Sequence, residues 1–351
     1  MTTPTQGQQR LSVEKLNAWE ALGYGMFIHF GMSTYDGDEL SKGDRPATTY
    51  APDQLDVDQW VRVAREAGMK YAVLTAKHVA GFCLWPTKLT DYHVGRSGNH
   101  TDVVEAFVNA CDRHGIAPGL YYCSWDNHHL FGSATPSFTR WENAFTTTEY
   151  RDFQMAQVEE LLTQYGPLRE VWIDVPHLLG HDGRRKQYDQ IVRLQPEAVI
   201  MMNGGIADGS RLNYNSAWPT DLMAIERYLP NSLEGYNPWH RISHGGVYAP
   251  TRDPGRFEYK TAGSMSRLEY KPVEADYYLP GEVCDPIGQE WFWVPNDLPR
   301  SDAELLGMRL ICRERHASLL LDVPPDTNGL IPKHYADALM RLRKNMEQVA
   351  G

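Results

Sequence analysis

Two apolar, strand-like runs in the first quarter of the chain each carry a histidine at their end. The run YGMFIHFG at 24–31 contains His29, and the run KYAVLTAKH at 70–78 ends on His78. In barrels of parallel strands, side chains at the C-terminal strand ends meet at one face, where the chemistry takes place. Two histidines at matching ends therefore indicate a shared ligand. For each one alone, the ordinary alternative is a structural, hydrogen-bonded histidine.

Asp174 is the most informative ionisable residue, because it interrupts the apolar run EVWIDVP at 170–176. A buried carboxylate is costly unless it has partners or a catalytic role. The alternative is an ion-paired or helix-capping aspartate at a strand end. Because strand side chains alternate, Trp172 lies on the same face as Asp174. An aromatic ring beside a carboxylate suits a sugar whose reacting carbon meets the carboxylate.

The other apolar runs also end on polar or ionisable residues. These are Lys77, Ser124, Trp125 and Asp126 with His128 and His129 beyond them, Asn203, Glu226 and Asp322. Aromatic residues in polar surroundings, such as Trp85 and Trp125, add faces on which a sugar ring can stack. A metal site built on the histidines is an alternative, but neither HExxH nor a His-x-His pair after the first strand is present. We therefore expect a carbohydrate site without a metal or another cofactor.

Elements that position these residues alternate between strand-like and helical patterns. Strands are predicted at 24–31, 70–78, 117–124, 170–176, 198–204, 222–229, 289–295 and 318–325, and helices at 53–67, 101–114, 149–165, 183–195, 301–315 and 332–347. This order predicts an α/β protein with a (β/α)8 TIM-like barrel. The alternative is an open doubly wound sheet, but no glycine-rich dinucleotide motif follows the first strand. We interpret 1–351 as one catalytic domain, 1–15 as a flexible N-terminal segment, and 205–221 and 230–286 as loops.

Composition excludes some classes of partner. The 351 residues carry a formal net charge of −11, which argues against a nucleic-acid partner. The N-terminus is polar, and no apolar run is long enough to span a membrane. The five cysteines form no CxxC pair, which is typical of reduced thiols. We expect a cytoplasmic protein without a membrane partner; whether it forms a homo-oligomer is left open.

Longer stretches of the chain resemble the α-L-fucosidases of glycoside hydrolase family 29. They are FIHFG, KYAVLTAKHVAGFCLWPTKLTDYHV, TDVVEAFVNACDRHGIAPGLYYCSWDNHH, LTQYGPLREVWIDV and SLLLDVPPDTNGLIP. The resemblance covers most of the chain and implies a (β/α)8-like barrel. It also implies a retaining mechanism with an aspartate nucleophile in a W-x-D motif, which Trp172-Ile173-Asp174 matches. Glu226, in DLMAIERYLP, is the favoured acid/base, with Glu282 and Glu290 as alternatives.

The resemblance further implies residues that bind the sugar. They are His29, His78, Trp172 and a tyrosine of LYYC, for which we choose Tyr122. Together with Trp85, Trp125 and Asn203 they make up the candidate substrate-binding set.

The chain also departs from the family pattern. Val79 and Ala80 stand where the family has His and Asp, and Asn203-Gly204-Gly205 stands where many members have a sugar-binding arginine. The Glu-Trp pair common after the first strand is absent, and no C-terminal β-sandwich follows the last helix. We therefore expect a retaining exo-α-glycosidase that acts on L-fucose or a fucose-like sugar, in a fucosylated oligosaccharide or glycoside. The alternatives are a catalytically inactive sugar-binding barrel and a metal-dependent hydrolase that uses the strand-end histidines.

Overall fold

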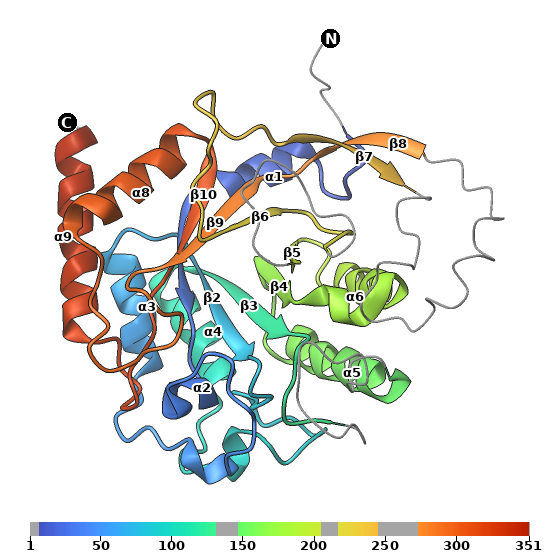
Figure 1. Ribbon diagram of the computed structural model, residues 1–351, viewed down its shortest axis with the longest axis vertical. Helices are drawn as coiled ribbons and strands as arrows, with labels where there is room; N and C mark the ends of the chain where they lie inside the picture. The colour runs from blue at the N-terminus through green and yellow to red at the C-terminus, as the bar shows by residue number, and fades with distance from the viewer. Residues whose placement is uncertain (1–6, 131–146, 205–216, 245–272, 351) are drawn as a thin grey trace.

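The computed structural model describes residues 7–130, 147–204, 217–244 and 273–350. Within them, one eight-stranded parallel sheet has the order β5-β4-β3-β2-β1-β10-β9-β6 and curls into a barrel (Figure 1). Its strands are β1 (Tyr24–Ile28), β2 (Tyr71–Lys77), β3 (Ala117–Cys123), β4 (Glu170–Asp174), β5 (Val199–Asn203), β6 (Met223–Glu226), β9 (Gly281–Pro286) and β10 (Ala317–Asp322). The predicted (β/α)8 TIM-like barrel is confirmed.

The seam between β5 and β6 is closed without a strand ladder. The backbone N–H of Asp221 donates to the carbonyl of Ile200 at 2.8 Å, and that of Met202 donates to Thr220 Oγ1 at 3.1 Å. These bonds satisfy backbone groups that an open sheet edge would leave unpaired. They also bring Asn203 and Glu226, at the ends of these two strands, to the same face.

Helices follow the strands and cover the outside of the barrel. Their N-termini carry the expected caps, since Asp56 accepts from the N–H of Gln59 and Asp102 from that of Glu105. Ser301 and Glu304 form a reciprocal capping box. The helices are α1 (Val13–Glu20), α2 (Met32–Asp36), α3 (Val57–Glu66), α4 (Val103–His114), α5 (Thr148–Gln164), α6 (Gly180–Leu194), α8 (Asp302–Glu314) and α9 (Lys333–Ala350).

The seventh predicted strand is wrong. The run at 289–295 is a loop, and the strand lies just before it, at Gly281–Pro286. Two further strands, β7 (Trp239–His244) and β8 (Val273–Tyr278), form an antiparallel hairpin outside the barrel, in a stretch interpreted as loop. The parts of the predicted loops at 205–216 and 245–272 lie outside the described residues.

The predicted flexible segment at 1–15 is wrong for its second half. Arg10 donates to Asp221 and to the carbonyl of Ala198, Leu11 is buried, and Ser12 caps α1. This segment and α1 lie against the N-terminal end of the barrel. Residues 1–6 lie outside the described part of the chain.

The barrel interior is apolar in the middle and polar at both ends. Its central layers contain Phe27, Val73, Tyr121, Met201 and Leu320. At the N-terminal end, Glu170 and Glu282 form a buried carboxyl pair. The N–H of Trp172 reaches both of them, at 2.5 Å and 3.0 Å, Tyr71 donates to Glu282, and Trp19 of α1 donates to Glu170.

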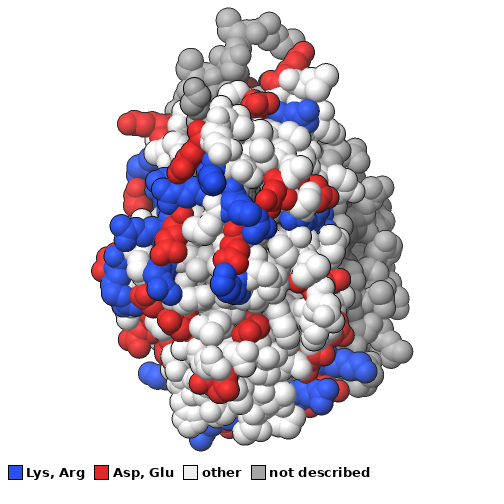
Figure 2. Space-filling model, turned by 90° about the vertical axis from the view of Figure 1, so that its left-hand side faces the viewer, with Lys and Arg blue, Asp and Glu red and all other residues white. Residues whose placement is uncertain are grey.

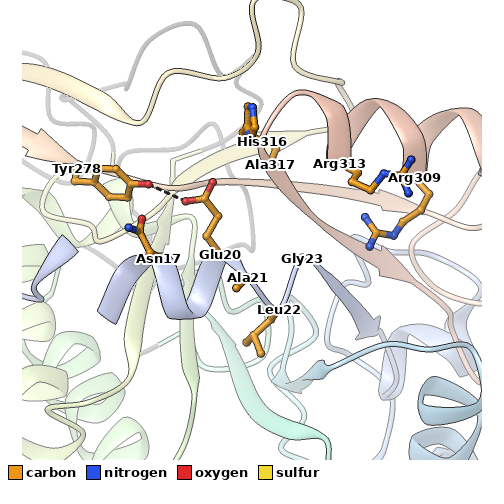
Figure 3. Close-up of a pocket in the computed structure, with 10 residues that line it drawn as sticks. All are labelled: Asn17, Glu20, Ala21, Leu22, Gly23, Tyr278, Arg309, Arg313, His316 and Ala317. Atoms are coloured by element: carbon orange, nitrogen blue, oxygen red, sulfur yellow. Dashed lines mark hydrogen bonds between the residues drawn. The ribbon is translucent and has the colours of Figure 1, made fainter. Parts of the chain in front are cut away.

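The outer surface at this end is hollowed. A cavity of about 520 Å³ is lined by residues that include Gly23, Arg309 and Arg313, and by Glu20, which accepts from the hydroxyl of Tyr278 (Figure 3). The two arginines lie in the C-terminal half of α8, where the helix dipole favours cations. This cavity lies at the opposite end of the barrel from Asp174 and Glu226.

Charges on the face around α8 and α9 are mixed in sign (Figure 2). Basic side chains of α9 pair with carboxylates, as in Lys333–Asp337 and Arg341–Asp302. Among the described residues, no helix has the length and apolar composition needed to cross a bilayer.

Candidate active site

Asp174 lies at the C-terminal end of β4, inside the barrel, and two side-chain donors point at its carboxylate. The hydroxyl of Tyr121 donates to Oδ2 at 2.6 Å, and Asn203 Nδ2 donates to Oδ1 at 2.9 Å. Burial raises the pKa of Asp174 to about 7, and the nearby Glu226 carboxylate adds to this rise. The hydrogen bonds from Tyr121 and Asn203 oppose the rise, because they favour the ionised form.

Asn203 links Asp174 to Glu226. Its amide nitrogen donates to Glu226 Oε2 at 3.0 Å as well as to Asp174. Because Asp174 Oδ1 and Glu226 Oε2 bond the same nitrogen, these two oxygens are at most about 6 Å apart, a limit that accommodates the carboxyl spacing of retaining glycosidases. Burial raises the pKa of Glu226 too. Two buried carboxyls this close titrate as a pair, and the one with fewer donors, Glu226, is the better place for a shared proton.

His29 and His78 face each other across the same end of the barrel, with ring centroids 5.5 Å apart. Burial lowers the pKa of both imidazoles, that of His29 to about 3, so both rings are neutral at physiological pH. His29 Nδ1 lies 2.8 Å from Asp322 Oδ1. His78 stacks on Tyr121, with centroids 5.6 Å apart and the planes inclined by 17°. The structure thus brings these two histidines, Asp174, Asn203 and Glu226 together, as the strand ends predict.

A bulge in β2 decides which side chain enters the site. The register with β3 shifts between Thr75 and Lys77, so Lys77 points outward although Tyr71 and Val73 point inward. Outside the barrel, Lys77 pairs with Asp126 at 2.5 Å and lies over the ring of Tyr122. His78, the next residue, is thereby turned into the barrel.

Two of the predicted sugar-binding residues, Tyr122 and Trp85, lie elsewhere, whereas Trp125 packs in the same apolar cluster as Val175, the neighbour of Asp174. Tyr122 points outward and donates to Gln157 of α5, so the tyrosine in the site is Tyr121 instead. Trp85 is buried against α5, where its N–H donates to Glu160. Trp125 donates to Asn127 Oδ1 and packs on the inner apolar cluster that contains Val79.

Trp172 keeps its place below Asp174 but turns its N–H away from the site. It is 1% exposed and packs on Phe27 and Tyr121, with ring centroids 5.1 Å and 6.2 Å away. Its N–H is bound by the carboxyl pair at the N-terminal end of the barrel. Trp172 therefore forms part of the floor beneath the site.

The two alternative acid/base residues lack the hydrogen-bonded link to Asp174 that Glu226 has through Asn203. Glu282 lies at the N-terminal end of β9, fully buried against Glu170 and Tyr71. Glu290 is exposed, in the loop that follows β9. Glu226, at the end of β6, is the glutamate that Asn203 joins to Asp174.

The same loop supplies site residues that sequence reasoning missed. Trp291 lies 5.2 Å from the ring of His29, and Phe292 lies 5.2 Å from His29 and 4.9 Å from His78. Arg227 stacks over Trp291 at 5.0 Å. The only sequence signal was the aromatic content of QEWFWVP, which also made it resemble a strand.

Glu39 was missed as well, in the loop after β1 from which the family's Glu-Trp pair is absent. Its carbonyl oxygen accepts from Ser33 Oγ at 3.2 Å. Burial raises the pKa of the Glu39 carboxyl to about 7, with Arg227 lowering it and the Glu226, Glu290 and Asp322 carboxylates adding to the rise. These interactions place Glu39 beside the site.

Side-chain geometry gives no support to a metal centre. Among the residues that the structure describes, no group of three or more His, Cys, Asp and Glu side chains is arranged to hold an ion. The nitrogen of His29 that faces Asp322 is already hydrogen-bonded.

Comparison with known proteins identifies the family. The sequence model of the family described as Alpha-L-fucosidase matches residues 44–349. Alpha-L-fucosidase 1 of Arabidopsis thaliana is 30% identical in a match 322 residues long, which covers 89% of this chain and 56% of that protein. The chain thus spans little more than half the length of this curated relative.

Solved structures share the fold. Alpha-L-fucosidase isoenzyme 1 from Paenibacillus thiaminolyticus superimposes with a TM-score of 0.70 at 23% identity, over 95% of this chain and 75% of that one. The alpha-L-fucosidase AlfC from Lactobacillus casei, in complex with alpha-L-fucose, superimposes with a TM-score of 0.67 at 19% identity, over 96% of this chain and 99% of that one. At these identities the structures compare folds alone, whereas the match over 44–349 covers most of the sequence. The chain belongs to the alpha-L-fucosidase family of glycoside hydrolases.

Proposed function

We propose that this protein is a retaining exo-α-glycosidase that releases L-fucose or a fucose-like sugar, with Asp174 as nucleophile and Glu226 as acid/base. The observation that carries the proposal is the amide of Asn203, which bonds one oxygen of each carboxyl. Carboxyl groups about 5–5.5 Å apart suit a retaining reaction, whereas inversion needs about 6.5–9.5 Å to admit a water. The choice of L-fucose or a similar sugar rests on the names of the relatives, which are alpha-L-fucosidases.

The two steps follow from the environments of the carboxyls. Asp174, held by Tyr121 and Asn203, is the better anion and attacks the anomeric carbon, forming a glycosyl ester as the bond to the leaving oxygen breaks. Glu226 donates its proton to that leaving oxygen. It then takes a proton from water, which attacks the anomeric carbon and breaks its bond to the carboxylate oxygen of Asp174, freeing Asp174.

The test uses Asp174→Ala, Glu226→Ala and, as a matched control, Glu290→Gln at an exposed glutamate of the nearby loop. With an aryl α-L-fucoside, Asp174→Ala should abolish turnover. Glu226→Ala should lose about 10²–10⁴-fold in kcat/KM on substrates whose leaving group needs protonation. Loss should be smaller for a very acidic aryl leaving group, which needs no acid. The control should remain near the original activity, and turnover by Asp174→Ala at that level would refute the nucleophile.

Azide separates the two roles further. It should restore turnover to both variants, giving the fucosyl azide of inverted configuration with Asp174→Ala and of retained configuration with Glu226→Ala. The same configuration from both variants would contradict the assignment. A panel of aryl α-glycosides of L-fucose, L-galactose and D-arabinose then defines the sugar.

A second candidate, a sugar-binding barrel without turnover, is favoured by one observation. Val79 is 2% exposed within an apolar cluster, so it offers no hydrogen bond where the family has a histidine. Sugar binding in calorimetry together with no cleavage of any glycoside in the panel would establish this candidate. Cleavage of any of them would exclude it.

A further inference from the structure

Asp322 and His29 form a buried pair where β10 and β1 run side by side. Phe27 is the register partner of Asp322, and His29 follows Phe27 by two residues. Asp322 Oδ1 lies 2.8 Å from His29 Nδ1 and 3.2 Å from the backbone nitrogen of the same residue. His29 is 4% exposed and Asp322 is 0% exposed.

The backbone bond decides the direction of the side-chain bond. A backbone N–H can only donate, so Asp322 Oδ1 is an acceptor. Nδ1 of His29 faces the same oxygen and therefore brings its hydrogen to it. Because burial and the Arg227 charge lower the pKa of His29 to about 3, the ring is neutral and has one N–H only. Nε2 then carries a lone pair, and it has no partner among the described residues.

The ring of His29 has no room to turn over. Phe27 lies 4.5 Å away between ring centroids, Trp291 and Phe292 each lie 5.2 Å away, and His78 lies 5.5 Å away. A flipped ring would also leave Oδ1 facing a carbon. Packing thus fixes the plane of the ring, and Asp322 fixes which nitrogen carries hydrogen.

We propose that Asp322 is a positioning residue that holds His29 in the Nδ1–H tautomer, so that Nε2 faces the pocket as an acceptor. A sugar bound there must offer a hydroxyl hydrogen to Nε2. An ether oxygen or a deoxy carbon at that position leaves the lone pair, covered by the bound sugar, without a donor, which weakens binding of that sugar and makes the site selective for a hydroxyl. This inference rests on the proposed function and adds that, at one contact, the protein accepts the hydrogen bond and the sugar donates it.

The protonation of Asp322 itself does not alter this assignment. Burial raises the pKa of Asp322 well above its usual range, Asp285 and Asp297 add to the rise, and Arg227 opposes it. Oδ2 is buried and lacks a hydrogen-bond partner among the described residues. A proton on Oδ2 would therefore leave Oδ1 the acceptor of both N–H groups.

The direct test is the ¹⁵N spectrum of the full protein with labelled histidine, in which protonated and unprotonated ring nitrogens differ in shift. The signals absent from His29→Gln belong to His29. We expect a protonated Nδ1 and an unprotonated Nε2 in the original protein and in Asp322→Asn, whose carbonyl oxygen can accept both bonds. Asp322→Ala should show a mixture or the other tautomer. A protonated Nε2 in the original protein would overturn the inference.

Kinetics with an aryl α-L-fucoside give the second readout. Asp322→Ala should lose about 10–100-fold in kcat/KM, the cost typical of removing a residue that orients a ligand-binding histidine, while Asp322→Asn stays within about fivefold. Equal losses in both variants would show that charge or folding matters instead of the acceptor oxygen. Because the spectrum needs no turnover, it tests the tautomer even if the proposed glycosidase activity fails.

Discussion

The buried carboxyl pair at the N-terminal end of the barrel should make folding stability fall as pH rises. Burial raises the pKa of Glu282 from 4.5 to about 7, and burial together with Glu282 raises that of Glu170 well above its usual range. The folded state therefore holds protons that the unfolded chain releases. The contribution of these protons to the unfolding free energy is therefore fully present below about pH 4.5, and it is lost as the pH rises through about 7.

The size of the effect follows from the pKa of Glu282. Its rise to about 7 corresponds to about 3 kcal/mol, at about 1.4 kcal/mol for each pH unit. Glu282→Gln removes the titrating group while its amide oxygen still accepts from Tyr71. Between about pH 5 and pH 8, the unfolding free energy of the variant should therefore fall by about 3 kcal/mol less than that of the original protein.

Urea unfolding followed by tryptophan fluorescence at a series of pH values measures this difference. Glu290→Gln is the control, because it removes an exposed carboxylate from the same segment of chain and should keep the original pH dependence. Other buried carboxyls contribute to the slope in both proteins, so the comparison between them is what counts. If the unfolding free energies of Glu282→Gln and the original protein change with pH by the same amount to within about 1 kcal/mol, the inference that folding raises the pKa of Glu282 is wrong.

Three further perturbations test the site and its support. Tyr121→Phe removes a donor to the Asp174 carboxylate, so the pKa of Asp174 should rise above about 7 and the acidic limb of the kcat/KM profile should move to higher pH; an unmoved limb would contradict the contact. Asn203→Ala should lower kcat about 10-fold or more with little change in thermal stability, because it removes one hydrogen bond from each carboxyl; a change in KM alone would contradict a role in the reaction. Asp126→Asn leaves the buried Lys77 without its counter-ion and should lower the unfolding free energy by about 3–5 kcal/mol in urea titrations, whereas an unchanged midpoint would mean that Lys77 is solvated.

Strand-end reasoning found most of the site because it depends only on where apolar runs stop. His29, His78, Asp174, Asn203 and Glu226 were all predicted in this way, and the structure gathers them at one end of the barrel. To choose between the adjacent tyrosines, one must know which residues of β3 point into the barrel and which point outward. Tyr121 and Tyr122 do not reveal this from the sequence, because both side chains are aromatic and both are buried.

The misplaced seventh strand has a physical cause as well. GEVCDP, the actual strand, has no continuous apolar run, because Glu282 and Cys284 line the barrel and Asp285 follows them. The following run is more apolar, since Trp291 and Phe292 pack on the two histidines as a loop. The carboxyl of Glu282 is buried beside that of Glu170, which lies far away in sequence. The sequence of β9 alone therefore does not show that Glu282 belongs to a buried strand.

The bulge in β2 decides the electrostatic sign of the pocket. If the same residues ran in regular alternation without the bulge, the pattern that turns Tyr71 and Val73 inward would turn Lys77 inward too. An ammonium group would then stand where the neutral ring of His78 stands and would hold Asp174 in an ion pair. Deleting Ala76 would leave Thr75 and Lys77 as direct neighbours and would keep Lys77 outward, whereas removing the bulge with every residue retained would exchange a hydrogen-bonding wall for a fixed cation. The backbone irregularity in this short segment is therefore as much a part of the active site as the identity of its residues.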